Sequence, residues 1–129
     1  MPDGKPMFNA RSETAATKPM FADGMKQRRC IIPATLYFEW EKHGTQKIKH
    51  AIFPTGSDMI YMAGIYRIEE KRAACSILTR TPADCIAHIH DRMPVILPKE
   101  AVPDWLNLRY DPQEVLSAAL GKMTFQPCT

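Results

Sequence analysis

Three short segments place polar side chains that could do chemistry at the ends or edges of apolar runs. They are 9–14 (N-A-R-S-E-T), 37–40 (Y-F-E-W) and 89–94 (I-H-D-R-M-P). Together they offer an amide, carboxylates, an imidazole and guanidinium groups, which are side chains that move protons, stabilise oxyanions and hold phosphates. Each segment alone is a weak signal, so the chemistry depends on whether the fold brings them together.

Glu39 is the sharpest single candidate because it lies between Phe38 and Trp40 in an aromatic run. Burial there would suit its carboxyl group to proton transfer near neutral pH. The alternation of a strand also supports a plainer interpretation, a carboxylate on the solvent face with Phe38 and Trp40 on the opposite face. The sequence leaves both interpretations open.

His90 and Arg92 form a second candidate pair. His88, His90 and Asp91 together could suggest a metal site, but no second ligand pair at zinc spacing accompanies them, so we expect neither a metal nor another cofactor. His90 could instead stabilise an oxyanion or an iminium-forming carbonyl while Arg92 holds a phosphate. A structural histidine is the alternative.

Asn9 and Arg11 would point to the same side of an extended segment, where they could grip a sugar and its phosphate. The alternative is a helix cap with a surface salt bridge from Arg11 to Glu13. From the residues alone this alternative is the stronger one.

The strands that must position these residues are predicted by apolar, β-branched and aromatic runs between glycines and prolines. The first is expected at 30–41, with an interruption near Pro33 and a hairpin loop after it at 42–45. The further strands, which begin as an antiparallel meander, are expected at 46–53, 59–66, 73–80, 94–97 and 123–127. The class is therefore α+β with a mainly antiparallel sheet.

Helices fill the gaps between these strands, and the segment 2–8 is expected to be a loop. A helix should start near Ser12 and stop at Pro19. Asp111 followed by Pro112 is a strong helix start, and Gly121 is well placed as its stop. The remaining helical stretches are expected at 21–27, 82–89 and 99–106.

Composition bounds the class of protein. The 129 residues are 45% hydrophobic and 24% charged, which is typical of one globular domain, 1–129, or a part of one. The net charge of +3 does not by itself indicate a nucleic-acid partner. The four cysteines lack C-x-x-C spacing, so reduced and mostly buried thiols are expected. No apolar run is long enough for a membrane span, which predicts a cytoplasmic protein without a membrane partner.

Taken in order, three motifs closely resemble those of the SOS-response-associated peptidase (SRAP) family. They are N-A-R-S-E-T-A, then R-R-C-I-I-P-A followed by Y-F-E-W, and then I-H-D-R-M-P-V-I-L. The resemblance runs from about Phe8 to about Leu106 and implies the family's open antiparallel barrel with short helices. It also implies abasic-site processing in single-stranded DNA, with crosslinking, autopeptidase and lyase activities.

The family's chemistry gives the catalytic candidates their roles. A cysteine exposed after removal of the initiator methionine attacks the ring-opened aldehyde of an abasic site and closes a thiazolidine crosslink. By this resemblance Asn9 contacts the sugar, Glu39 is the general acid and base, and His90 stabilises the intermediate.

DNA contacts follow from the same resemblance. Arg11 and Arg92 would bind the phosphates that flank the lesion, Asn9 its sugar, and Thr79 would line the same pocket. The implied partner is single-stranded DNA that carries abasic sites, and the implied location is the nucleoid.

Two departures from the family pattern limit these expectations. Position 2 is Pro2, and the family's M-C-G-R-F start is absent, so we expect a domain without its N-terminal part that only binds DNA or is inactive. Leu36 stands where the family usually has glycine before the aromatic residues. Sheet edges left unpaired would favour self-association. The alternatives are a non-covalent single-stranded DNA-binding module and a cysteine peptidase with autoprocessing activity.

Overall fold

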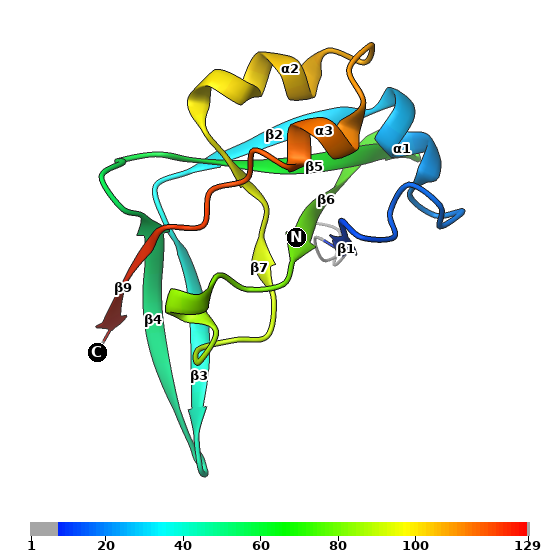
Figure 1. The fold of residues 1–129 in the computed structure, drawn as a ribbon. Helices are drawn as coiled ribbons and strands as arrows, with labels where there is room; N and C mark the ends of the chain where they lie inside the picture. The colour runs from blue at the N-terminus through cyan, green and yellow to red at the C-terminus, as the bar shows by residue number, and fades with distance from the viewer. Residues whose placement is uncertain (1–7, 129) are drawn as a thin grey trace.

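The fold is built on two β-sheets (Figure 1). A computed structural model describes residues 8–128. In spatial order the main strands of the larger sheet are β1 (Phe8–Arg11), β6 (Arg72–Arg80), β5 (Ile60–Glu69) and β2 (Arg29–Ala34). Two short strands extend it, because β7 (Met93–Pro94) pairs with β6 and β8 (Ile96–Leu97) pairs with β5. The sheet is antiparallel except where β1 pairs with β6 in parallel.

The smaller sheet is antiparallel throughout and holds β3 (Tyr37–His43), β4 (Gln46–Pro54) and β9 (Met123–Cys128) in that order. The β3–β4 hairpin projects away from the larger sheet, and its tip is the part of the smaller sheet farthest from the larger sheet (Figure 1). Gly44 has φ of 60° in the hairpin turn, a left-handed conformation that suits glycine. One face of the hairpin is covered by the chain, since His88 packs against the buried His50, and the other face leaves Phe38 and Trp40 exposed.

The larger sheet is covered, on the side away from the hairpin tip, by the short helices α1 (Ala22–Gln27), α2 (Val102–Leu106) and α3 (Pro112–Leu116), whereas the turn η1 (Asp84–Ile86) lies beside the hairpin (Figure 1). Asp111 caps α3 as its sequence predicts, because its side chain accepts from the backbone N–H of Gln113 at 3.0 Å. No helix within residues 8–128 is long and apolar enough to cross a membrane. The turn η2 (Lys99–Ala101) directly precedes α2, and η marks a 3₁₀ turn.

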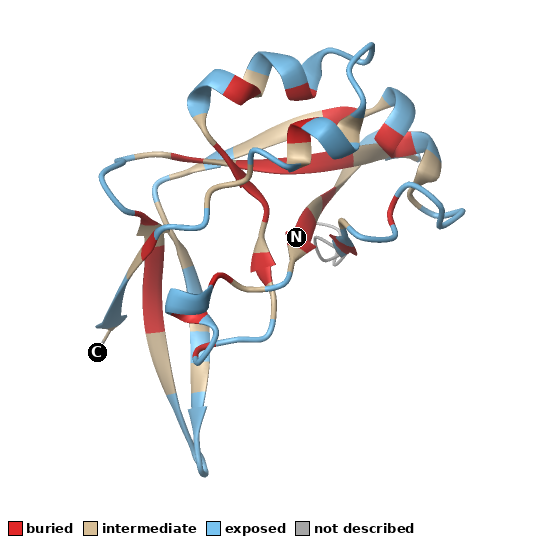
Figure 2. Ribbon diagram, viewed as in Figure 1, coloured by how far each residue is buried: buried red, intermediate tan, exposed pale blue. Residues whose placement is uncertain are grey.

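Two apolar clusters form the core, one under the helices and one between the two sheets (Figure 2). The first is organised around Trp105, which is fully buried and donates from its indole N–H to the carbonyls of Cys30 at 2.9 Å and Gly64 at 3.2 Å. Arg29 is also buried, and it donates to the carbonyl of Met25 at 2.7 Å. Arg29 is thus a structural residue and not part of a surface charge patch.

The predicted α+β class is confirmed, but the strand pairing differs from a simple meander. β4 pairs with β9 and not with β5, so the chain forms two sheets. Pro33 lies within β2 and does not interrupt it, because β2 is an edge strand where proline is tolerated. The break in the predicted first strand falls at 35–36 instead.

Three helix predictions also need correction. The helix expected from Ser12 is a run of turns, and β1, which precedes it, was not predicted as a strand. The helix expected at 82–89 is reduced to η1. The last helix ends at Leu116, before Gly121. By contrast, the helical stretches at 21–27 and 99–106 are confirmed as α1 and as η2 with α2.

Candidate functional site

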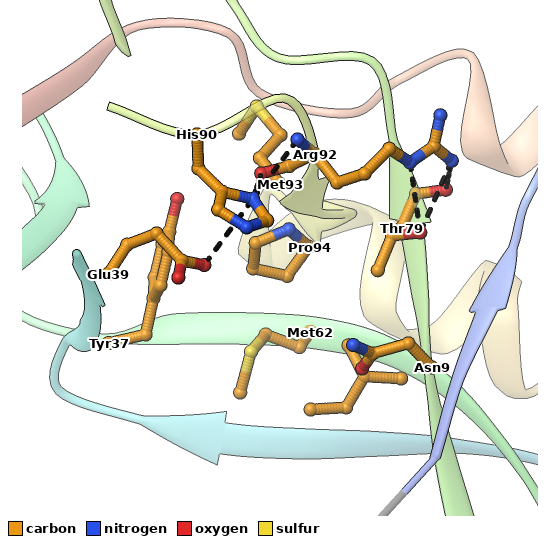
Figure 3. A pocket seen from close by; sticks show the side chains of 10 residues that line it. Asn9, Tyr37, Glu39, Met62, Thr79, His90, Arg92, Met93 and Pro94 are labelled. Atoms are coloured by element: carbon orange, nitrogen blue, oxygen red, sulfur yellow. Dashed lines mark hydrogen bonds and ion pairs between the residues drawn. The ribbon is translucent and has the colours of Figure 1, made fainter. Parts of the chain in front are cut away.

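A pocket of about 200 Å³ opens where β1, β3, β6 and the loop before β7 meet (Figure 3). Its walls come from segments far apart in the sequence, which is why no single motif predicted it. Its polar lining residues are Asn9, Tyr37, Glu39, Thr79, His90 and Arg92, and its apolar lining residues are Met62, Ile77, Met93 and Pro94.

Glu39 points into this pocket with Tyr37, two residues earlier on β3 (Figure 3). Phe38 and Trp40 are 45% and 46% exposed on the other face of the strand. The predicted alternation is thus correct, and the interpretation that put Glu39 on the solvent face is wrong. The aromatic side chains took the solvent side, and the carboxylate took the inner side.

His90 faces Glu39 across the pocket, with 3.8 Å between its Nδ1 and Oε2 of Glu39 (Figure 3). The same Nδ1 lies 3.2 Å from both the backbone N–H and the carbonyl of Arg92 and 3.5 Å from Oδ1 of Asp91. Nδ1 accepts from the Arg92 N–H when unprotonated and donates to the carbonyl when protonated. The loop therefore holds the ring in either state, and a proton on Nδ1 lies between two carboxylates.

Arg92 ties the wall of the pocket together. Its Nη1 and Nη2 donate to the two carboxylate oxygens of Glu13 at 2.8 and 2.7 Å, and Nη2 also donates to the carbonyl of Thr79 at 2.9 Å. The hydrogen bond from Arg92 lowers the pKa of Glu13 from 4.5 to about 2, and Glu13 in turn raises the pKa of Arg92. The guanidinium joins the 12–21 turns to β6 and the loop before β7.

Asn9 and Arg11 are both exposed, and Ala10 between them is buried, so β1 does present the pair on one side. Asn9 lines the pocket, and Arg11 lies beyond its lining, level with Thr79 in the register of β1 and β6. Glu13 forms its salt bridge with Arg92 and not with Arg11, the partner that the sequence suggests. The charge of Arg11 is the smallest of the influences that set the pKa of Glu13.

Tyr37 is the first residue of the Y-F-E-W motif, for which the sequence predicts no role, and the structure makes it part of the pocket. Its hydroxyl is buried and has no hydrogen-bond partner among residues 8–128. Burial raises the pKa of Tyr37, which keeps the hydroxyl protonated as a donor. The strand alternation that pairs it with Glu39 was the signal that could have identified it.

A second carboxylate and histidine group lies on the same face of β3. Glu41 accepts from Nε2 of His50 at 2.8 Å and contacts Nε2 of His43 at 3.1 Å. The rings of His50, His88 and Phe125 pack edge to face. The hydrogen bond from His50 holds the pKa of Glu41 below its ordinary value. No group of three or more His, Cys, Asp or Glu side chains within residues 8–128 is arranged to hold a metal ion.

Comparison with known families shows which protein family this chain belongs to. The model of the SOS response associated peptidase (SRAP) family matches residues 2–127. The chain belongs to the SRAP family. Among curated SRAP relatives it is 37% identical to abasic site processing protein YobE of Bacillus subtilis over 123 residues, and 32% identical to abasic site processing protein YedK of Escherichia coli over 121 residues. Each alignment covers 91% of this chain, and 56% and 54% of those proteins, so the chain spans about half the length of the curated relatives it matches.

Two solved structures share the fold of this chain. A crystal structure of a Bacteroides thetaiotaomicron protein superposes with a TM-score of 0.82 at 30% identity, over 94% of this chain and 58% of that one. A phage-related protein of Bordetella bronchiseptica has a TM-score of 0.77 over 97% of this chain and 66% of that one, and its 23% identity supports the fold alone. Five of the six residues to which the SRAP resemblance gave a role, all except Arg11, line one pocket of this SRAP chain.

Proposed function

We propose that the pocket receives the sugar of an abasic site in single-stranded DNA and that Glu39 and His90 move protons on it. The observation that carries this proposal is the meeting of Glu39 and His90, 3.8 Å apart, over a pocket with an apolar floor. Membership in the SRAP family and the names of the curated relatives support the lesion as the ligand. Such binding would place the protein at the nucleoid in the cytoplasm.

The chemistry of the lesion explains these residue types. A ring-opened abasic sugar carries an aldehyde, and an amine that adds to it forms a carbinolamine. Loss of water from the carbinolamine needs an acid to protonate the departing hydroxyl, and the resulting iminium needs a base when it is hydrolysed. Glu39 donates and accepts this proton, and His90, on the facing wall, stabilises the carbinolamine oxygen by hydrogen bonding.

The attacking amine is not supplied by the residues that line the pocket. Its lining contains neither lysine nor cysteine. Cys30, Cys75, Cys85 and Cys128 are internal, and a thiazolidine needs the amine and the thiol of one N-terminal cysteine. Pro2, the second residue of the sequence, lies outside the described residues. The proposal for the described pocket is therefore lesion binding and proton transfer.

Flanking contacts come from β1 and the loop before β7. Asn9 offers the amide that reaches the sugar, and Arg11 is the exposed cation beside it. Arg92 is already bound to Glu13 and Thr79, so we assign it to holding the pocket wall and the neighbouring phosphate together. An unpaired lesion enters such a pocket without the cost of opening a duplex.

Non-covalent binding of single-stranded DNA is the second candidate function. The half-exposed indole of Trp40 favours it, because exposed aromatic rings stack bases without sequence preference. A conventional cysteine peptidase has less support, since no cysteine among residues 8–128 lines the pocket with His90.

Fluorescence anisotropy with three matched single strands tests the proposal. They carry an intact base, a reduced abasic analogue that cannot react, or a natural abasic site. We expect the analogue to bind roughly tenfold more tightly than the intact strand, a difference of about 1.4 kcal/mol. We call the pocket lined by Glu39 and His90 the lesion pocket. Equal affinity for these two strands would overturn the proposal that it binds the lesion, and non-covalent binding of single-stranded DNA would remain as the function.

A denaturing gel of the same mixtures tests the proton transfer. With the natural site, borohydride traps any iminium formed with an amine of the protein or an added amine. Glu39→Gln should slow trapping by about tenfold to a thousandfold with unchanged binding of the analogue, and Glu100→Gln, exposed in η2, serves as the matched control. Equal trapping by the Glu39 variant would remove its catalytic role.

A further inference from the structure

The solvent face of the β3–β4 hairpin gathers aromatic and basic side chains. Strand alternation and the register pairs Trp40↔Lys49 and Lys42↔Lys47 put these side chains on one face, opposite the one that carries Glu39. We call it the hairpin face, and its members are Phe38, Trp40, Lys42, Lys47 and Lys49.

The hairpin face carries positive charge that no neighbouring acid on the hairpin offsets. The two acidic residues of β3, Glu39 and Glu41, point to the opposite face, and β4 contains none. Lys42 and Lys47 stand directly across from each other, a like-charge pair that destabilises a sheet unless an anion lies between the two. The face is therefore complementary to a chain of negative charges.

Aromatic rings on the same face narrow the choice of anion. Phe38 is 45% exposed, and the Nζ of Lys49 lies 4.1 Å from its ring centroid and 5.6 Å from that of Trp40. The ammonium group of Lys49 is thus held beside two flat aromatic surfaces. Bases that stack on the rings while phosphates meet the lysines would use both features, and an acidic protein surface would use only the charge.

The hairpin face is continuous with the lesion pocket. A second hollow, of about 340 Å³, lies between the hairpin and the loop before β7, and its walls include Trp40, Lys42 and His88. His90 lines both this hollow and the lesion pocket. A strand whose lesion sits at Glu39 can thus run past Trp40 onto the lysine row.

We infer that the hairpin face is a second binding surface for single-stranded nucleic acid, with Lys42, Lys47 and Lys49 on the phosphates of the flanking strand and Phe38 under its bases. The direction of the strand away from the lesion rests on the proposed function, and the affinity of the face for nucleic acid does not.

The salt dependence of DNA binding measures this surface directly. The variant K42Q/K47Q/K49Q is compared with K18Q/K26Q/K99Q, which removes the same charge from exposed lysines away from the hairpin. With a strand of about twenty nucleotides, the slope of log K against log salt should fall by about 2 in the hairpin variant, since each lost phosphate contact accounts for about 0.7. The control should keep the slope of the parent protein, and an equal slope in both variants would overturn the inference.

Two further variants guard against a folding defect. Lys47→Gln alone should lower the slope by about 0.7, and Phe38→Ala should weaken binding of the long strand at least about fivefold with little change in its slope. A strand of about three nucleotides that spans only the lesion should bind all these variants like the parent protein. If the variants change self-association and leave DNA binding unchanged, the partner is a second copy of the chain and the inference fails.

The two proposals fail in different ways. If intact and abasic strands bind equally but the hairpin variant lowers the slope, the lesion pocket is wrong and the hairpin face stands. If the lesion is preferred and the hairpin variant has the parent slope, the lesion pocket stands and the hairpin face is wrong.

Discussion

Arg92 holds Glu13 through two parallel hydrogen bonds, of 2.8 and 2.7 Å, although 79 positions separate the two residues in the chain. The same guanidinium donates to the carbonyl and the hydroxyl of Thr79. Arg92 follows His90 by two residues, so this pair fixes the end of the loop that brings the imidazole to Glu39. A planar fork suits this task, because it fixes both direction and distance.

The Glu13 pair predicts a stability difference that depends on pH. The folded pKa of Glu13, about 2, lies below its ordinary value of 4.5, so its contribution is present above about pH 4.5 and is lost as pH falls toward 2. Glu13→Gln should lower the free energy of unfolding by about 0.5 to 1 kcal/mol near neutral pH, a modest amount because the carboxylate is 47% exposed. Urea unfolding of parent and variant should show the two converging toward pH 2. A gap that is equal at both pH values would contradict the assignment, and Glu100→Gln should show no gap.

His50 predicts a contrast between two substitutions. Its side chain is 5% exposed, Nε2 donates to Glu41 at 2.8 Å, and Nδ1 is buried without a partner among residues 8–128. Glutamine keeps a donor that can reach Glu41, and phenylalanine keeps the ring but removes the donor. His50→Phe should therefore melt at a lower temperature than His50→Gln in thermal unfolding followed by circular dichroism. The opposite order would mean that ring packing against His88 and Phe125 outweighs the hydrogen bond.

The β3 strand shows how far local patterns lead and where they stop. Alternation correctly grouped Tyr37 with Glu39 and separated both from Phe38, because it is a property of a single strand. It could not say which group faces inward, since that depends on the 87–91 loop, whose His88 packs against His50 on one face of the sheet from a distant position in the chain. Hydrophobicity favours burial of Phe38 and Trp40, but the tertiary structure buries the face that carries Tyr37 and Glu39.

Local signals were sufficient where the stabilising contact is itself local. Asp111 and Pro112 start α3 because the cap and the first turn lie within a few residues. The four-residue strand β1 carries no such signal, because its hydrogen bonds are to β6, more than sixty positions away in register pairs such as Ala10↔Leu78. The same reason hid the Glu13 and Arg92 pair, whose attraction appears only after β1 and β6 meet.

Gly64 predicts a packing defect at the centre of the larger sheet. A Cβ at this position would lie 2.4 Å from Cδ1 of Ile32 and 3.0 Å from the carbonyl oxygen of Ser76. Because the second neighbour is backbone, Gly64→Ala should lower the free energy of unfolding by about 1 to 3 kcal/mol. Gly121→Ala is the control, since no heavy atom of residues 8–128 beyond its chain neighbours lies within 4 Å of the position that the new methyl group would occupy. Chemical denaturation of the two variants checks the contrast, and equal midpoints would show that Ile32 and the strand move aside at no cost.

Thiol reactivity separates the cysteines by position in the fold. Burial, and then the nearby Cys75, raise the pKa of Cys30 to about 12, so almost none of it is thiolate near pH 8. Cys85 is exposed within η1, and iodoacetamide reaches it without any opening of the fold. Peptide mapping after a short treatment near pH 8 should find Cys85 modified first and Cys30 last, with all four thiols modified after unfolding in urea. Early labelling of Cys30 would mean that the β2 edge of the sheet opens readily. The hydrogen bonds from the Trp105 indole to the carbonyls of Cys30 and Gly64, at 2.9 and 3.2 Å, would then be weaker than these distances indicate.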